Sequence, residues 1–351
     1  MSTQAPEHDR RAAETPLAPV QVGEAAAARA ADEGLSRHAA PDFFIVGHHK
    51  CGTTALYKML RRHPQIYMPD LKEPRFFATD MRQRFQPRRA GPLPATLTEY
   101  LALFDAAGPE QLRGEASPSY LVSRAAAGEI AAVRPDARII AILREPASFL
   151  HSLHLQFVQS HVETKKDLRR AMSLEAARRQ GRRIPRRSFR PQDLQYSEHV
   201  RYVEQLRRFH AMFPAKQMLV LIYDDFRNDN EATVRAVLRF LGVEDTMPVA
   251  AQDANPTVRL RSQWLDELVH EVSVGRDPLS RAAKTAIKAL APRPLRRDAL
   301  AAVRGRIVVG KPRPPEERFV LELRRRFKGE VVALSEYLGR DLVSLWGYDQ
   351  L

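Results

Sequence analysis

The chain has 351 residues, of which 44% are hydrophobic, so it is long enough for one large α/β domain or two small ones. Its formal net charge of +14 favours an anionic partner. Its apolar runs fall short of the roughly 18 to 20 residues that span a bilayer, and its N-terminus lacks a basic-then-apolar leader. The single cysteine, Cys51, excludes an internal disulfide framework. We therefore predict a cytoplasmic protein.

Composition divides the chain into a tail and a domain. Residues 1–40 are rich in alanine and show no sustained hydrophobic periodicity, which predicts a disordered or loosely helical tail. Residues 41–351 contain no internal repeat. We predict that they form a single folded domain.

The first motif of the domain joins a strand to a helix. The apolar run 43–46 is followed by Gly47-His48-His49-Lys50-Cys51-Gly52-Thr53-Thr54 and then by residues 55–60, which have helical spacing. The first N–H groups of a helix have no internal partner, and the helix dipole favours an anion there. The motif therefore predicts a phosphate cradle. A cysteine beside a lysine at such a position is also expected to have a lowered pKa, although no thiol chemistry is required.

The remaining elements are predicted in chain order from their spacing and end signals. They are a short strand at 66–68, a helix from the N-cap Thr98 to residue 107, a turn-bearing segment at 114–121, a helix at about 124–133, a strand at 138–143 and a long helix from about 147. A basic stretch at 165–190, an amphipathic helix at 198–213, a strand at 218–223, a helix at about 230–241 ending at Gly242, and helices at 262–274, 280–290 and about 315–338 follow.

Three apolar strands that alternate with helices predict the fold class. They indicate an α/β protein with a single P-loop-like domain, in which helices flank both faces of a central parallel β-sheet. Right-handed crossovers place the carboxyl ends of the strands, and therefore the site, along one edge.

The order of residues in the phosphate loop separates two families. In G-x-x-x-x-G-K-[ST] the lysine follows the last glycine, whereas Lys50 lies two residues before Gly52. This order resembles the 5′-phosphosulfate loop of the sulfotransferase family, which uses 3′-phosphoadenylyl sulfate (PAPS) as sulfuryl donor. The resemblance implies that Lys50, Cys51, Gly52, Thr53 and Thr54 bind the donor, that Lys50 is catalytic at the leaving phosphate, and that no metal is required.

A second motif follows the strand at 138–143. Arg144-Glu145-Pro146 with Ser152 eight residues after the arginine resembles the 3′-phosphate motif of the same family. The resemblance implies that Arg144 and Ser152 bind the 3′-phosphate of PAPS. The family often has a further basic residue where Phe149 stands, so that contact is missing or replaced here.

A third motif supplies a candidate base. Lys72-Glu73-Pro74-Arg75-Phe76-Phe77 resembles the Lys-Glu-x-x-Phe-Phe segment of glycan sulfotransferases, which implies that Glu73 deprotonates the acceptor. His151 and His154 are alternative bases, because small-molecule sulfotransferases use a histidine. Glycan-type members often have a lysine where Ala116 stands in Glu115-Ala116-Ser117-Pro118-Ser119-Tyr120, another segment that resembles the family.

We predict a PAPS-dependent sulfotransferase of bacterial style that transfers the sulfuryl group to a hydroxyl in preference to an amine. The acceptor, whether carbohydrate, lipid, peptide or secondary metabolite, stays open, as does the oligomeric state. The rival functions are a P-loop nucleotide kinase or NTPase and a basic nucleic-acid-binding protein. The basic loop at 178–190 is either a lid that gathers an anionic acceptor or a solvated loop, and Lys311 and Arg313 are left without a role.

Overall fold

The computed structural model describes residues 40–81, 93–186, 188, 190–246, 259–260, 309–310 and 315–351. Several sequence predictions fall outside the described residues. They are the tail up to residue 39, the helices at 262–274 and 280–290, and any role of Lys311 and Arg313.

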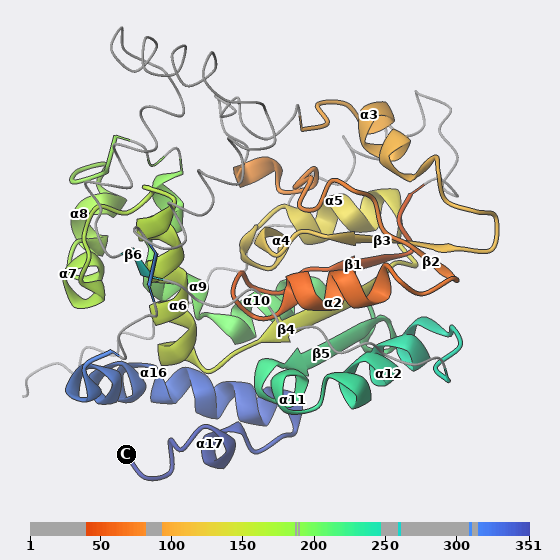
Figure 1. Ribbon diagram of the computed structural model, residues 1–351. Coiled ribbons are helices and arrows are strands. Elements are labelled where there is room, and N and C mark those ends of the chain that lie inside the picture. The colour runs from red at the N-terminus through yellow and green to blue at the C-terminus, as the bar shows by residue number, and fades with distance from the viewer. Residues whose placement is uncertain are drawn as a thin grey trace, which may run out of the picture.

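A parallel sheet of five strands forms the centre of the fold, in the order β2-β3-β1-β4-β5 (Figure 1). The strands are β1 (Phe43–Ile45), β2 (Ile66–Tyr67), β3 (Leu112–Ala116), β4 (Arg138–Leu143) and β5 (Met218–Ile222). Phe44 pairs with Glu115 of β3 on one side and with Ile139 of β4 on the other. Strand β4 is buried from residue 139 to 143, as its continuous apolar run predicted. The predicted α/β class is confirmed.

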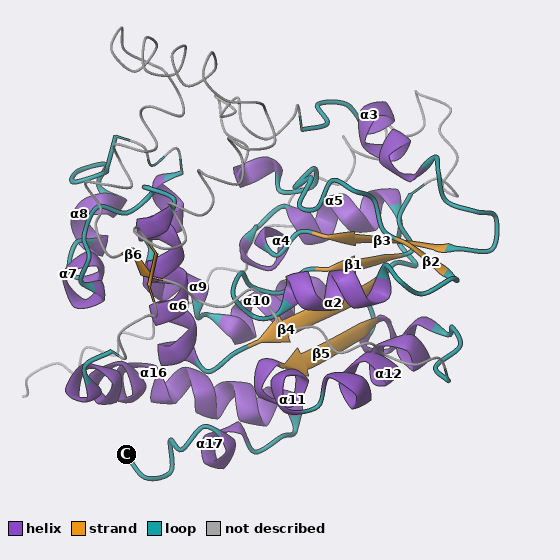
Figure 2. Cartoon of the chain, viewed as in Figure 1, coloured by secondary structure: helices purple, strands orange, loops and turns teal. Residues whose placement is uncertain are grey.

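Chain direction decides which helices cover which face of the sheet. The connection from β1 to β2 runs toward the β2 edge of the sheet. The connections from β3 to β4 and from β4 to β5 run toward the opposite edge, which β5 forms. Right-handed crossovers therefore put α2 (Thr53–Leu60) on one face, where it contacts α12 (Asn230–Leu241). The opposite face is covered by α5 (Ala126–Val133) and α10 (Tyr202–His210), which contact each other (Figure 2).

The remaining elements surround this core. The helices are α3 (Leu97–Leu101), α4 (Ser119–Val122), α6 (Pro146–Gln159), α7 (Leu168–Met172), α8 (Glu175–Arg179), α9 (Tyr196–His199), α11 (Tyr223–Asn228), α16 (Glu317–Leu338) and α17 (Leu342–Leu345). Short 3₁₀ turns occupy Thr79–Met81, Ala102–Phe104, Pro191–Leu194 and Ala215–Gln217, and β6 (Arg259–Leu260) pairs antiparallel with β7 (Val309–Gly310). Helix α12 ends at Gly242, whose φ of 68° is left-handed, as predicted. None of the described helices combines the length and the apolar character needed to cross a bilayer.

Strand β3 corrects the prediction of a turn-bearing segment at 114–121. Its sequence, Leu-Arg-Gly-Glu-Ala, contains two charges and a glycine and has no strand signature. The glycine is required by packing, because a Cβ at Gly114 would lie 2.1 Å from the ring of Phe43 and 2.4 Å from the sulfur of Met68. Neighbouring strands, which the local sequence does not show, therefore make this segment a strand.

Two further boundaries differ from the prediction. The helix expected from Thr98 to residue 107 begins at Leu97 and ends at Leu101, and its N-cap is Thr96, whose side chain accepts from the N–H of Glu99. The helix expected over 198–213 is divided into α9 and α10. The basic stretch at 165–190, for which no helix was predicted, contains α7 and α8.

Candidate active site

The loop between β1 and α2 lies at the carboxyl edge of the sheet, and its backbone conformation is fixed by packing. Lys50 and Gly52 are both left-handed, with φ of 65° and 85°. A Cβ at Gly52 would lie 2.8 Å from the ring of Phe226, and a Cβ at Gly47 would lie 2.5 Å from the backbone nitrogen of Ile142. Glycine is therefore needed at both positions for the loop to close against β4 and α11.

The same loop presents a set of unpaired backbone donors. Within the described chain, the N–H groups of residues 50 to 54 donate to no acceptor, and the N–H groups of Ala55 and Leu56 are the first that bond to the loop, through the carbonyl of Gly52. The unpaired N–H groups at a helix start favour an anion, so such a run of donors fits a phosphate or phosphosulfate group. The residues present therefore fit the 5′ end of PAPS.

Arg144, at the end of β4, lies directly against this loop. Its Nη1 donates to the carbonyl oxygen of Lys50 at 3.0 Å, and its Nε and Nη2 donate to the hydroxyl of Ser148 at 2.9 and 2.6 Å. The guanidinium carbon also lies 4.7 Å from the centre of the Tyr223 ring. The structure thus brings together two cations that the sequence separates by 94 residues.

The electrostatics of Lys50 follow from that arrangement. Burial lowers the pKa of its ammonium group, and the charge of Arg144 lowers it further. Two cations held this close repel each other, so the site gains from an arriving anion.

Ser152 lies on α6, one turn beyond Ser148 and on the same side of the helix, and its side chain is buried. The guanidinium of Arg144 bonds the hydroxyl of Ser148 in this structure. Sequence reasoning assigned no role to Ser148, although its position four residues after the arginine was the available signal. The roles of Arg144 and Ser152 toward the 3′-phosphate stay predictions.

Glu73 lies in a cluster of basic side chains. Its Oε1 accepts from the Nζ of Lys72 at 2.8 Å, and its Oε2 accepts from the Nη2 of Arg75 at 2.5 Å. The Nδ1 of His49 lies 3.9 Å from the same carboxylate, so the first loop and the Lys72–Phe77 segment meet at this glutamate. Sequence reasoning did not connect His49 with Glu73.

These neighbours set the charge of Glu73. Burial alone raises the pKa of Glu73, but the surrounding positive charges outweigh burial and hold the pKa below its ordinary value. Burial lowers the pKa of His49 to about 4, so this histidine is neutral at pH 7. The positive charges that lower the pKa of Glu73 at neutral pH are therefore those of Lys72 and Arg75. Glu73 is therefore ionised at neutral pH and free of the proton that a base must accept.

Two other histidines, His154 and His48, have structural partners. His154 is buried, with Nδ1 3.0 Å from the hydroxyl of Tyr196 and Nε2 3.2 Å from the carbonyl of Lys166. His48 is bonded to Gln205 at 2.7 Å, and burial lowers its pKa to about 3. Burial likewise lowers the pKa of His151. With both ring nitrogens engaged, His154 is poorly placed to accept a proton from a substrate.

Cys51 corrects one expectation. Its side chain is fully buried, and burial raises the pKa of the thiol to about 12 instead of lowering it. Desolvation of the thiolate thus outweighs the neighbouring charges of Arg144 and Lys50. Cys51 is a small, inert residue of the loop.

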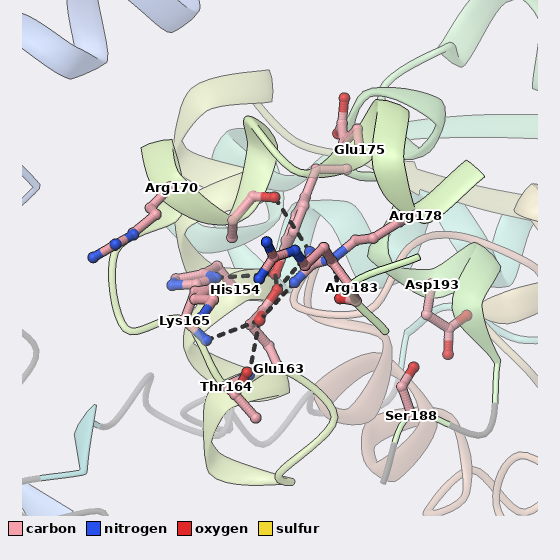
Figure 3. Close-up of polar contacts among 12 residues, drawn as sticks. His154, Glu163, Thr164, Lys165, Arg170, Glu175, Arg178, Arg183, Ser188 and Asp193 are labelled. Atoms are coloured by element: carbon pink, nitrogen blue, oxygen red, sulfur yellow. Dashed lines mark hydrogen bonds and ion pairs between the residues drawn. The ribbon is translucent and has the colours of Figure 1, made fainter. Parts of the chain in front are cut away.

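One arginine of the basic loop at 178–190 is internal, whereas residues 180–183 of that loop are exposed. Arg178 is buried and forms an ion pair with Glu163 at 2.7 Å, which in turn accepts from the N–H groups of Thr164 and Lys165 (Figure 3). Arg178 also donates to the carbonyl of Ala171. This arginine, predicted within a lid or a solvated loop, is therefore an internal support for the segment, whereas Arg170 points away from the cluster (Figure 3).

The C-terminal segment braces the same edge of the sheet. Glu145 caps α6 by accepting from the N–H groups of Ala147 and Ser148, and it also accepts from the hydroxyl of Tyr348 at 2.6 Å. The indole N–H of Trp346 donates at 2.9 Å to the carboxylate of Asp224, which lies just after β5. The last residues of the chain thus hold the segments that follow β4 and β5.

The fold and this loop define an α/β protein with a candidate phosphate site at the carboxyl edge of a parallel sheet. A family model described as "Sulfotransferase family" matches residues 41–247, which is more than half of the chain. The chain belongs to the sulfotransferase family. The match ends before α16, before α17 and before Trp346 and Tyr348, which follow α17.

Individual relatives support this assignment over part of their length. The chain is 32% identical to carbohydrate sulfotransferase 15 of Mus musculus over 162 residues, covering 34% of this chain and 28% of the relative. It is 27% identical to heparan sulfate glucosamine 3-O-sulfotransferase 3A1 of the same species, covering 61% and 48%. The chain therefore spans less than half the length of these two relatives. A solved sulfotransferase from Alicyclobacillus acidocaldarius is 28% identical with a TM-score of 0.53, covering 73% of this chain and 99% of that one.

Proposed function

We propose that this protein transfers a sulfuryl group from PAPS to a hydroxyl of a carbohydrate. The observation that supports it most is the approach of Arg144 to Lys50, which places two cations at the unpaired N–H groups of the phosphate loop. Members of this family use PAPS as donor, and PAPS supplies a sulfur atom joined to a good leaving phosphate.

The proposal assigns separate roles to the residues that bind the donor. Lys50 neutralises the charge that grows on the leaving 5′-phosphate oxygen, with Cys51, Gly52, Thr53 and Thr54 contributing backbone and hydroxyl donors. Arg144 and Ser152 hold the 3′-phosphate, and Ser148 orients the guanidinium of Arg144.

Glu73 acts on the acceptor. Its ionised carboxylate takes the proton of the acceptor hydroxyl as that oxygen attacks sulfur and the bond from sulfur to the 5′-phosphate oxygen breaks. Its contact with the phosphate loop through His49 supports a position beside the reacting group.

A carbohydrate acceptor is supported by the relatives, whose names specify a carbohydrate and heparan sulfate. The Lys72-Glu73 pair agrees with such an acceptor, whereas Ala116 stands where glycan-type members often have lysine. We further propose a single catalytic domain over residues 41–351 and a cytoplasmic location, the latter from composition alone.

Two measurements test the proposal. Calorimetric titration with adenosine 3′,5′-bisphosphate (PAP), without magnesium, is expected to show binding tighter than that of ATP with magnesium or of duplex DNA. Preference for ATP with magnesium would establish the nucleotide kinase or NTPase, and preference for DNA the nucleic-acid-binding protein. Transfer of radiolabelled sulfate from PAPS to de-O-sulfated heparan sulfate is then expected, and transfer only to lipid or small-molecule acceptors would overturn the carbohydrate assignment.

A further inference from the structure

The loop that carries Glu73 has an unusual backbone. Glu73 and Arg75 are both left-handed, with φ of 62° and 55°, although neither is glycine. An L-residue in this region crowds its Cβ against the backbone, so the conformation persists only where surrounding structure imposes it. Something outside the loop must therefore hold Glu73 in place.

That support comes from the end of β3 and the start of α4. The N–H of Glu73 donates to the carbonyl of Ala116 at 3.1 Å, and the N–H of Arg75 donates to the hydroxyl of Ser117 at 3.1 Å. The N–H of Phe77 donates to the hydroxyl of Tyr120 at 3.3 Å. Alternate N–H groups of the loop are thus bonded to one short segment.

Glu115 determines how the last of these bonds forms. Its Oε2 accepts from the hydroxyls of both Tyr100, at 2.7 Å, and Tyr120, at 2.9 Å. Because Tyr120 gives its proton to Glu115, a lone pair of the same hydroxyl faces the N–H of Phe77. The carboxylate therefore orients the hydroxyl that holds the loop.

The burial of Glu115 is costly and calls for an explanation. Its side chain is fully buried, and its Oε1 has no hydrogen-bond partner in the described part of the chain. Burial also raises its pKa to about 7. A buried carboxyl with an unsatisfied oxygen costs free energy, so its presence here points to the bonds that its other oxygen makes.

We propose that Tyr120, oriented by Glu115, is a positioning residue that holds Glu73 in its left-handed conformation beside the phosphate loop. The proposal rests on the proposed function, in which Glu73 is the base. Tyr120 is hydrogen-bonded to the N–H of Phe77 and to Glu115, so its effect on Glu73 passes through the backbone of the loop.

The chain offers a matched control for this role. Tyr100 and Tyr120 are both fully buried, and both donate to the same oxygen of Glu115. The ring of Tyr100 stacks on Phe76 at 4.7 Å, but only the hydroxyl of Tyr120 accepts from the loop backbone. Replacing either tyrosine with phenylalanine removes one bond to Glu115, and only Tyr120→Phe frees the loop.

The experiment compares Tyr120→Phe with Tyr100→Phe in transfer from PAPS to de-O-sulfated heparan sulfate. We expect Tyr120→Phe to lower kcat about tenfold, with the PAP affinity unchanged, and Tyr100→Phe to stay within about twofold of wild type. Hydrogen exchange at residues 73–77 is expected to accelerate in Tyr120→Phe alone, a readout that requires no acceptor. Equal losses of kcat, or equal rates of hydrogen exchange at residues 73–77, in the two variants would overturn the proposal. The bonds of Glu115 to the two tyrosines would then only stabilise the fold.

A second comparison separates this inference from the proposed function. In a Glu73→Gln background, Tyr120→Phe is expected to cause no further loss of kcat, because both changes act on the same step. A full further loss would overturn the positioning role while leaving Glu73 as the base. Normal turnover by Glu73→Gln alone would instead overturn the base assignment and the inference with it. Ser117→Ala, which removes the neighbouring bond to Arg75, is expected to change kcat in the same direction as Tyr120→Phe.

Discussion

The guanidinium of Arg144 donates to the main-chain carbonyl of Lys50 at 3.0 Å, across 94 residues of sequence. This bond joins the end of β4 to the phosphate loop that follows β1. The residues proposed to bind the 5′-phosphate and the 3′-phosphate are therefore directly connected. Because the strands are parallel neighbours, their carboxyl ends meet at one edge, where Lys50 and Arg144 are both proposed to act on the donor.

Lys50→Ala is expected to reduce sulfuryl transfer at least a hundredfold, because the lysine neutralises charge that develops only in the transition state. Initial rates with radiolabelled PAPS measure this. Lys58→Ala is the matched control, since Lys58 is exposed on α2, and it should leave the rate unchanged. Normal turnover by Lys50→Ala would remove the loop lysine from the mechanism.

Glu73→Gln is expected to lower kcat about a hundredfold or more while PAP binds as in wild type, because the amide cannot accept the acceptor proton. Steady-state kinetics and calorimetry separate these two effects. His151→Ala and His154→Ala are the comparison variants. If either of them is inactive yet folded while Glu73→Gln turns over normally, a histidine is the base.

Glu115 should make stability depend on pH. Burial raises its pKa from 4.5 to about 7, so in that interval the folded protein keeps a proton that the unfolded chain has lost. The contribution of Glu115 to the free energy of unfolding therefore falls as the pH rises from 4.5 to about 7, by about 3 kcal/mol in all. Urea unfolding at several pH values should show that the free energy of unfolding of Glu115→Gln rises relative to that of wild type from acid to neutral pH. Glu110→Gln, at an exposed position, should show no such trend.

The buried Arg178–Glu163 pair should be sensitive to the loss of one partner. Glu163→Gln leaves the arginine buried without its counter-charge and is expected to cost about 3 kcal/mol or more of unfolding free energy. Thermal or urea unfolding measures the loss. Arg179→Gln, at a largely exposed neighbour, should change stability by less than about 0.5 kcal/mol. Equal effects would mean that the pair is not the internal support of the basic segment.

Tyr348→Phe tests whether the C-terminal segment shapes the donor site. The change removes the hydroxyl bond to Glu145, which caps the helix that carries Ser148 and Ser152. We expect PAP to bind between about twofold and tenfold more weakly, as calorimetry would show. Tyr337→Phe, which removes a hydroxyl bonded to His210 on α10, should leave PAP affinity unchanged. Identical affinities in both variants would contradict a role for Tyr348.

Local sequence predicted the elements whose pattern is complete within a few residues. The apolar runs of β1, β4 and β5 and the glycine at the end of α12 were found because burial on both sides and a left-handed cap leave a signature in adjacent positions. Strand β3 was missed because its Gly114 and Glu115 serve neighbours that lie far away in sequence.

The sequence by itself determined the family resemblance, the order of Lys50 and Gly52, and the residues proposed to act on the donor and the acceptor. Tertiary structure alone decided which of these side chains meet and what charge they carry. It placed Arg144 on the phosphate loop, His49 beside Glu73, and Cys51 in the core. The reason is physical, since helix caps and strand patterns depend on adjacent residues, whereas burial and electrostatic environment depend on residues that only folding brings together.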